Sequence, residues 1–245
     1  MDILDMQILG LNIIDVVIVL LLICGGIVGM KRGVFKELVM TVGTILLVVV
    51  SIVLKNPVAE FLSLNCPFLN FGGDIEGLVV INILFYQLVA FIVVFAVLNV
   101  IFNVVLTLTK WLERLLNITV ILGIASKILG FIVGVIESYI IVFLFCLALS
   151  YPIFNQEVVG NSVLHQNILR HTPILSNLSG AMTDVVDEVV ELAKTDVKDE
   201  TDEFNRQTVA IMLKHKLITA EYIEKLIEAE KIDIPGMEEV IAEYK

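Results

Sequence analysis

The sequence predicts an all-α fold, a four-helix integral membrane bundle followed by a helical, acidic C-terminal extension. Hydrophobic residues make up 58% of the chain and charged residues only 18%, against about a quarter in a typical soluble domain. The charges are also uneven, because residues 152–245 hold 18 acidic and 9 basic residues, which is −9 of the chain's net −11. We therefore expect a four-span transmembrane domain at 1–151 and a soluble helical C-terminal region at 152–245.

Four apolar runs are long enough to cross the roughly 30 Å hydrocarbon core of a bilayer, which takes about 20 helical residues. The third run carries no charge from Gly77 to Thr109. At about 1.5 Å per residue, we expect its helix either to tilt or to project beyond the lipid. The acidic start of the chain is unlike a signal peptide, so we expect the first helix to be retained. The predicted spans are about 11–30, 34–54, 78–109 and 123–150.

Basic residues predict the orientation of these helices, since Lys and Arg concentrate on the cytoplasmic side of a membrane. The connection between the second and third helices (55–76) has a single base, Lys55, and the N-terminal segment before the first helix has none. Both termini are therefore expected outside the cytoplasm, with the corner at 28–38 as a cytoplasmic turn. Six bases lie in or beside the other two connections: Lys31, Arg32, Lys36, Lys110, Arg114 and Lys127.

The connection at 55–76 is expected to fold separately from the helices that flank it. Two prolines, Pro57 and Pro67, and the pair Gly72 and Gly73 are helix breakers. Several large apolar side chains nevertheless make the segment too hydrophobic for a free loop. We expect a short helix at the membrane interface or a partial re-entrant segment.

Helical periodicity continues in the C-terminal region. Apolar residues within 181–193 recur at positions i, i+3, i+4, i+7 and i+8, which predicts an amphipathic helix. A charged break follows, and then a helical pair over 204–217 and 220–232, with Thr219 as the N-cap of its second helix. A last short helix is expected after the Pro-Gly pair at 235–236.

Acidic residues and glycines within the apolar runs predict contacts between helices. An aspartate such as Asp15 would cost about 2.5–3.5 kcal/mol in lipid, so we expect it to face protein. Glycines spaced four residues apart let two helices approach closely. The candidate helix-packing and topology residues are Asp15, Gly25, Gly29, Lys31, Arg32, Gly33, Glu37, Gly123, Lys127, Gly130, Gly134 and Glu137.

Two interpretations of the acids stay open, alongside partner docking through the same faces. In the first, glycine faces pack the helices, and the acids lie near interfaces or pair with Lys or Arg. In the second, Asp15, Glu37 and Glu137 belong to an ion or solute path, since intramembrane acids are often functional. The third span adds a polar face at Asn99 and Asn103, as expected of a compact bundle or an oligomer.

Patterns typical of catalytic, metal or nucleic-acid sites are weak. An intramembrane aspartyl protease needs two facing aspartates, and the apolar runs offer only Asp15. The histidines lie in the C-terminal region, where we interpret Ser162 and His165 as surface polarity. His165 and His171 have no carboxylate between them, and three dispersed cysteines form no disulfide or metal pattern. An acidic tail argues against nucleic acid. We predict no enzymatic activity and no cofactor.

Residues 12–38 (NIIDVVIVLLLICGGIVGMKRGVFKEL) resemble the opening of the colicin V production protein family of bacterial membrane proteins. That opening has an Asn/Asp pair, an apolar helix, and then G-x-x-(K/R)-G and an acid. Residues 121–138 are similar to the family's spaced glycines, with Ser126-Lys127 where an Asn/Asp-Arg pair is more usual. The matching residues are Asn12, Asp15, Gly29, Arg32, Gly33, Glu37, Gly130 and Gly134, with Ser162, Leu164 and Pro173 similar to the family's S-x-L…P stretch.

This resemblance covers about 10–175 and implies a four-helix protein of the bacterial inner or plasma membrane. It also implies a link to production or export of a peptide toxin and to envelope upkeep, with no assigned catalytic residues. We therefore expect a non-enzymatic multipass envelope protein. Its expected partners are membrane lipid and a second copy or other envelope membrane proteins, with no nucleic acid. The alternative is a small oligomeric channel or transporter that uses the intramembrane carboxylates.

Overall fold

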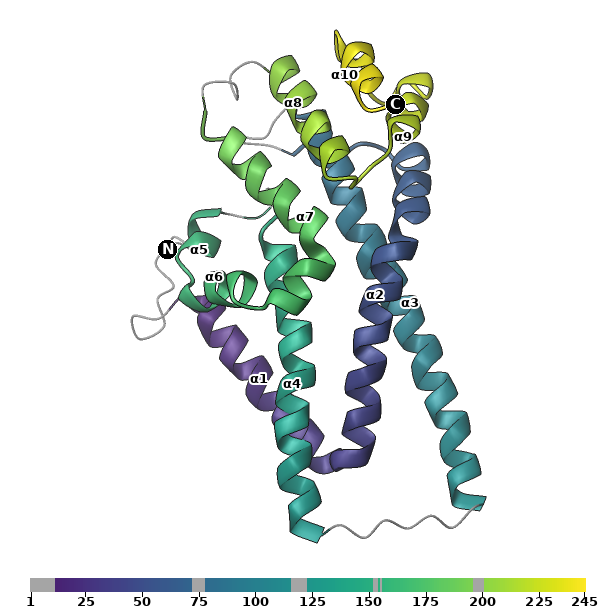
Figure 1. The fold of residues 1–245 in the computed structure, drawn as a ribbon, viewed down its shortest axis with the longest axis vertical. Helices are drawn as coiled ribbons and strands as arrows, with labels where there is room; N and C mark the ends of the chain where they lie inside the picture. Colours follow the sequence, from purple (N-terminus) through teal and green to yellow (C-terminus); the bar gives the residue numbers. More distant parts are fainter. Residues whose placement is uncertain (1–11, 72–77, 116–122, 152–153, 155, 196–200) are drawn as a thin grey trace. The chain divides into compact units, whose positions relative to one another are not determined.

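A computed structural model shows the chain as a series of α-helices, with no strand among the residues that it describes (Figure 1). This architecture confirms the all-α prediction. The residues described are 12–71, 78–115, 123–151, 154, 156–195 and 201–245.

Within the described residues, four helices are long and apolar enough to cross a membrane, as the hydropathy of the sequence predicts. The second and third are longer than their predicted spans, with 32 and 37 residues. At about 1.5 Å per residue, each exceeds the thickness of a bilayer core. The four helices are α1 (Ile13–Arg32), α2 (Val34–Asn65), α3 (Val79–Leu115) and α4 (Gly123–Leu149).

A single residue, Gly33, separates α1 from α2. Its φ of 79° lies in the region that glycine adopts at little cost, and its backbone N–H donates to the carbonyl of Gly29 over 2.9 Å. At the other end of α1, Asn12 is the N-cap, and its side chain accepts a hydrogen bond from the backbone N–H of Ile14. The tight corner expected at 28–38 is therefore a glycine turn.

Residues 55–65 differ from the expected separate segment, because α2 continues through Pro57 to Asn65. Proline removes one helical hydrogen bond, but tertiary contacts hold the helix beyond it. The Ser63 hydroxyl lies 2.6 Å from the Tyr222 hydroxyl, and Lys225 donates to Glu60 over 2.7 Å. Burial raises the pKa of Tyr222 to about 12, so this hydroxyl stays protonated near neutral pH. Gly72 and Gly73 lie outside the described residues.

Six shorter helices make up the rest of the helical structure that is described. Thr219 caps α9 as predicted, since its hydroxyl accepts from the backbone N–H of Tyr222 over 3.2 Å. Gly236, with a φ of 77°, precedes the last helix. The six helices are α5 (Gln156–Gly160), α6 (Val163–Arg170), α7 (Pro173–Leu192), α8 (Thr201–Lys214), α9 (Ala220–Glu228) and α10 (Met237–Glu243).

The chain forms two compact units, each assembled from separate stretches of sequence. The first unit comprises Met1–Ser51, Val93–Cys146 and Glu157–Leu175. The second unit comprises Ile52–Ile92, Leu147–Gln156 and Ser176–Lys245. The boundaries between them pass through α2, α3, α4, α5 and α7 and follow packing, whereas the predicted division at residue 151 follows hydropathy.

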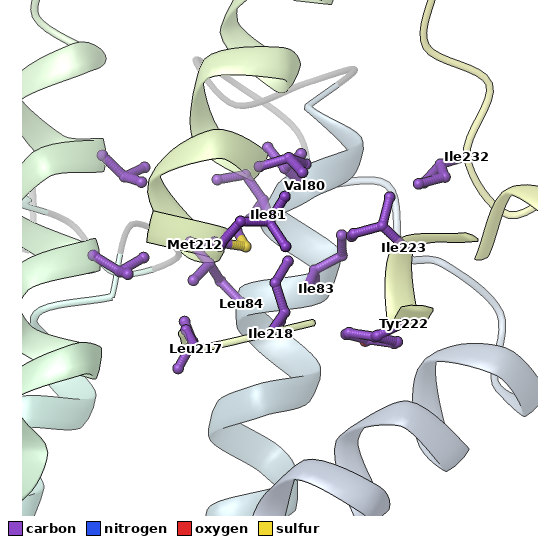
Figure 2. Close-up of a cluster of buried hydrophobic side chains, with 14 of the residues drawn as sticks. Val80, Ile81, Ile83, Leu84, Met212, Leu217, Ile218, Tyr222, Ile223 and Ile232 are labelled. Atoms are coloured by element: carbon purple, nitrogen blue, oxygen red, sulfur yellow. The ribbon is translucent and has the colours of Figure 1, made fainter. Parts of the chain in front are cut away.

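The core of the second unit joins the start of α3 to the C-terminal helices. Figure 2 shows Val80, Ile81 and Leu84 of α3 among side chains from 212–232, including Met212 and Ile223. Each of these five side chains is buried, and full burial of a large aliphatic side chain contributes about 1.5–3 kcal/mol. The first turns of α3 are therefore enclosed by protein.

Candidate functional site

Glycines bring the backbones of α1 and α4 into direct contact where the two helices cross (Figure 1). A methyl group on Gly29 would lie 2.2 Å from the carbonyl oxygen of Gly130, and one on Gly134 would lie 2.5 Å from that of Gly25. The Ser138 hydroxyl of α4 also donates to the carbonyl of Leu21 over 2.7 Å. The predicted glycine ladders of both helices are thus used within one chain.

An arginine at the end of α1 forms ion pairs with the two predicted acids of α2 and α4. Arg32 Nη1 lies 3.4 Å from Glu37 Oε2 and 3.4 Å from Glu137 Oε2. The Thr44 hydroxyl donates to the second carboxylate oxygen, Glu137 Oε1, over 3.1 Å. We call these four residues the Arg32 cluster. They come from three helices, and Glu137 is 105 residues from Arg32 in the sequence.

Local structure places each member of the Arg32 cluster. Arg32 is the last residue of α1, and Glu37 lies in the first turn of α2. At these positions each charge interacts favourably with the dipole of its helix. The turn at Gly33 brings them together, and the Ser126 hydroxyl of α4 accepts from the backbone N–H of Val34 over 3.2 Å. Helix α4 therefore contacts the turn itself as well as the charges.

The electrostatic balance of the Arg32 cluster is two carboxylates to one guanidinium. The Glu37 side chain is 1% exposed and that of Arg32 is 31% exposed. A guanidinium has five N–H donors in a planar fork and can serve two carboxylates at once. Buried charges of this kind are stable only when they are paired and hydrogen-bonded. The cluster can therefore fix the mutual positions of α1, α2 and α4.

A second cluster forms around Asp15 near the start of α1. Asp15 Oδ1 accepts hydrogen bonds from the Ser162 hydroxyl over 2.5 Å and from the backbone N–H of Leu164 over 3.0 Å. Asn12 Nδ2 donates to the carbonyl of Val158 over 2.9 Å. We call Asn12, Asp15, Ser162 and Leu164 the Asp15 cluster. As the sequence predicts, Asp15 faces protein, and the cluster attaches the segment 158–164 to α1.

The interpretation of Ser162 and His165 as surface polarity is wrong, because they are only 0% and 6% exposed. Ser162 caps α6 by accepting from the backbone N–H of His165 over 3.1 Å. His165 Nε2 lies 2.9 Å from the carbonyl oxygen of Cys146, which can only accept. A capping serine next to a carboxylate satisfies its polar atoms without water, which allows burial.

The other sequence-predicted residues lie apart from the two clusters. The side chains of Lys31 and Lys127 are exposed. Gly123 is the first residue of α4, and its surroundings lie outside the described residues. Among the described residues, no group of three or more His, Cys, Asp or Glu is placed to hold a metal ion.

Sequence reasoning missed three hydroxyl partners: Thr44, Ser126 and Ser138. The sequence gives Thr44 and Ser138 no partner, and the family resemblance includes Ser126 only as part of an atypical pair. A short hydroxyl residue facing an acid or a glycine on another helix leaves little local signal, because its partner is remote in sequence.

The family model for the colicin V production protein matches residues 14–173. The chain belongs to this family. The match, which extends over more than half of the chain, confirms the resemblance stated from the sequence. No curated protein and no solved structure matched the chain.

The colicin V production protein match contains the whole Arg32 cluster and, except for Asn12, the whole Asp15 cluster. Two separated stretches of the earlier resemblance meet in the structure, since Asp15 contacts both Ser162 and Leu164. Family membership and four apolar helices together identify a membrane protein.

Proposed function

We propose that the protein is a non-enzymatic multipass protein of the bacterial plasma membrane. It would support peptide toxin production or export, or membrane homeostasis, through contacts with lipid and with other membrane proteins. One observation carries the proposal: the charged residues of the family-like opening contact the same chain. Arg32 pairs with Glu37 and Glu137, and Asp15 binds Ser162 and Leu164. These charges serve to build the helix arrangement.

The proposal includes an orientation with both termini outside the cytoplasm. Its support is the six bases in the first and third connections, because such bases stay on the cytoplasmic side. The acidic C-terminal helices would then face away from the cytoplasm, where they could meet envelope partners.

Cysteine labelling in intact cells tests this orientation. Single cysteines would replace Lys31, Lys127, Asn70 and Glu243, all exposed, in a chain whose own cysteines are changed to alanine. A membrane-impermeant maleimide should label positions 70 and 243, and it should label 31 and 127 only after permeabilisation. The reverse pattern in intact cells would invert the protein and exclude this part of the proposal.

Self-association through α3 is the contact that we propose for the membrane region. Asn103 Nδ2 donates to the carbonyl and side-chain oxygens of Asn99 over 2.8 Å, and Thr107 donates to the carbonyl of Asn103. Asn103 and Thr107 are exposed, and their neighbours Val100 and Val104 are exposed apolar residues. An amide facing hydrocarbon gains about 0.6–2 kcal/mol from a partner on another helix.

A second copy of this chain suits the polar face of α3, because side-chain amides both donate and accept and two identical ladders are complementary. The double variant Asn99→Leu/Asn103→Leu should weaken dimerisation about fivefold to thirtyfold in lipid bilayers, measured by energy transfer between labelled copies. Val97→Leu, an exposed apolar position on the same helix, is the matched control. Equal dimerisation of the double variant and the control would exclude this contact.

A channel or transporter is the second candidate, and the charge balance of the Arg32 cluster favours it. Two carboxylates share one guanidinium that is partly exposed, and an excess negative charge within apolar helices can attract a cation. Purified protein in liposomes would be assayed for ion flux. Flux that Glu137→Gln abolishes but the exposed Glu191→Gln retains would support a channel, whereas wild-type flux equal to that of empty liposomes would exclude it.

A further inference from the structure

A buried lysine in the second unit has no acidic partner among the described residues. The Lys55 side chain of α2 is only 3% exposed. Its ammonium donates to Asn56 Oδ1 over 3.0 Å and to Gln87 Oε1 over 2.5 Å. Both acceptors are neutral amide oxygens, and Gln87 of α3 is itself buried.

Among the described residues, the partners of Lys55 are neutral and leave its charge uncompensated. An ammonium has three N–H donors, and the two amide oxygens account for two of them. Burying an isolated ion costs several kcal/mol even after the protein relaxes. A protein retains such a group at lower cost when an anion from outside the chain completes it.

Lys55 lines a small cavity together with a second lysine. The cavity has a volume of about 90 Å³, and Lys55, Asn56 and Lys216 supply its polar wall, with Ile52, Met182 and Leu217 on the apolar side. Lys216 has a φ of 56°, in the left-handed region that non-glycine residues seldom adopt. Since one water needs roughly 10–15 Å³ of open space, the cavity has room for a compact oxyanion.

The position of Lys55 along α2 matches a membrane surface. It follows Lys36, at the charged corner, by 19 residues, which is about 28 Å of helix. A hydrocarbon core is about 30 Å thick. If the corner lies at one surface of the membrane, Lys55 lies near the other, at the level of the lipid phosphates.

We propose that this cavity binds the phosphate group of an anionic phospholipid. Lys55 and Lys216 would hold the phosphate oxygens, and the side-chain N–H₂ of Asn56, whose oxygen already accepts from Lys55, can donate to them. The apolar wall formed by Ile52, Met182 and Leu217 would lie against the glycerol and the first acyl carbons. The inference goes beyond the proposed envelope function and does not depend on it.

Native mass spectrometry and thermal unfolding of the full-length protein in detergent would test this site with phosphatidylglycerol and, as a neutral comparison, phosphatidylcholine. The wild type should bind phosphatidylglycerol at least about tenfold more tightly, and this lipid should raise its melting temperature because it binds the folded state. Equal binding of the two lipids by the wild type would overturn the proposal.

Variants distinguish binding at this site from a general electrostatic attraction to anionic lipid. Lys216→Gly removes one charge while keeping a residue that tolerates the positive φ, so it should fold and lose about tenfold in affinity for phosphatidylglycerol. Lys55→Met should abolish the preference for this lipid. Lys194→Ala removes an exposed lysine elsewhere and should change the affinity less than about twofold. If Lys216→Gly binds like this control, the proposal fails.

Inorganic phosphate distinguishes the two sources of the oxyanion. We expect millimolar phosphate to leave both lipid binding and the melting temperature of the wild type unchanged, because it lacks the apolar part of the ligand. Stabilisation by phosphate equal to that by phosphatidylglycerol, lost in Lys216→Gly, would overturn the lipid assignment in favour of a free anion.

Discussion

Two cations differ in their surroundings: Arg32, just before α2, and Lys55, within it. Arg32, before the helix, has two carboxylates at 3.4 Å. Lys55 is more deeply buried, yet the described chain gives it only two amide oxygens. The first cation is neutralised by residues of the same chain, while the second is hydrogen-bonded without being neutralised.

This difference distinguishes a charge that stabilises the fold from a charge that is suited to binding a ligand. Where the chain supplies the counter-ions, removing the cation leaves buried carboxylates and should reduce stability under any condition. Where it does not, the cation is most costly without a ligand, and the effect of its removal should depend on what is bound. We expect the largest losses of stability at the Arg32 cluster, whose charges are paired within the chain, and smaller losses at the Asp15 cluster and at an exposed charge network.

The largest effect is expected from Gly29→Leu, because the Arg32 cluster needs the close approach of α1 and α4. The new side chain would meet the backbone of Gly130 and Gly134, with its first carbon 2.2 Å from a carbonyl oxygen. A backbone cannot move aside as a side chain can, so we expect a loss above about 4 kcal/mol and little folded protein.

Yield and thermal unfolding in detergent would measure the Gly29→Leu effect. Gly180→Leu in α7 is the matched control, since nothing lies within 4 Å of a side chain added there. A control as damaging as Gly29→Leu would show that the close approach is not the cause.

Arg32→Met should destabilise the protein by about 3 kcal/mol, since it leaves the buried Glu37 and the partly buried Glu137 without their cation. The melting temperature in lipid-free detergent would measure this, with the exposed neighbour Lys31→Met as control. Adding Glu37→Gln and Glu137→Gln to Arg32→Met should restore most of the loss. Lys55→Met should cost less than Arg32→Met, because it removes an uncompensated charge. A larger loss for Lys55→Met would contradict the comparison.

Ser162→Ala should cost about 2 kcal/mol, because it removes the N-cap of α6 and one donor to the carboxylate of Asp15. Thr219→Ala removes only an N-cap, that of α9, and should cost about 1 kcal/mol. Chemical or thermal unfolding of both variants measures the difference. Equal losses would mean that the bond to Asp15 contributes nothing.

The smallest effect is expected where charges are exposed. Hydrogen bonds from His215 and Lys214 hold the pKa of Glu188 below its usual range. A carboxyl with a lowered pKa stabilises the folded state above its ordinary pKa, and this contribution disappears as the pH falls through the lowered value. Because the pair is largely exposed, it contributes less than about 1 kcal/mol.

Melting temperatures of the wild type and Glu188→Gln would reveal this contribution. The variant should be slightly less stable near pH 6, and the difference should be smaller near pH 3, below the ordinary pKa of a carboxyl. The exposed Glu191→Gln is the control. A difference that is the same at both pH values would rule out the charge as its cause.

Local signals were sufficient for much of the fold. Long apolar runs predicted four membrane-length helices, and the cap at Thr219 was found from its sequence context. Asp15 was expected to face protein because lipid would exclude its charge. These features depend on hydropathy and on neighbours within a few residues, both of which can be read along the chain.

Such local signals could not predict the contacts between segments that are remote in the sequence. The sequence predicted acids in α2 and α4, yet Arg32 and Glu137 meet across 105 residues, and Ser162 is buried because Asp15 accepts its hydrogen bond. At Pro57 the local signal predicted a break, but Ser63 and Glu60 pack and bond against α9, and the helix continues.

The sequence by itself determined that this protein is helical, that four of its helices are fit for lipid, and that it resembles the colicin V production family. The tertiary structure decided which charges are paired. It enclosed the start of α3 in a core with the C-terminal helices, and within the described part of the chain it gave Lys55 neutral partners only. The reason is physical: hydropathy is a property of each residue, whereas neutralisation of a buried charge depends on which distant groups the packing brings within reach.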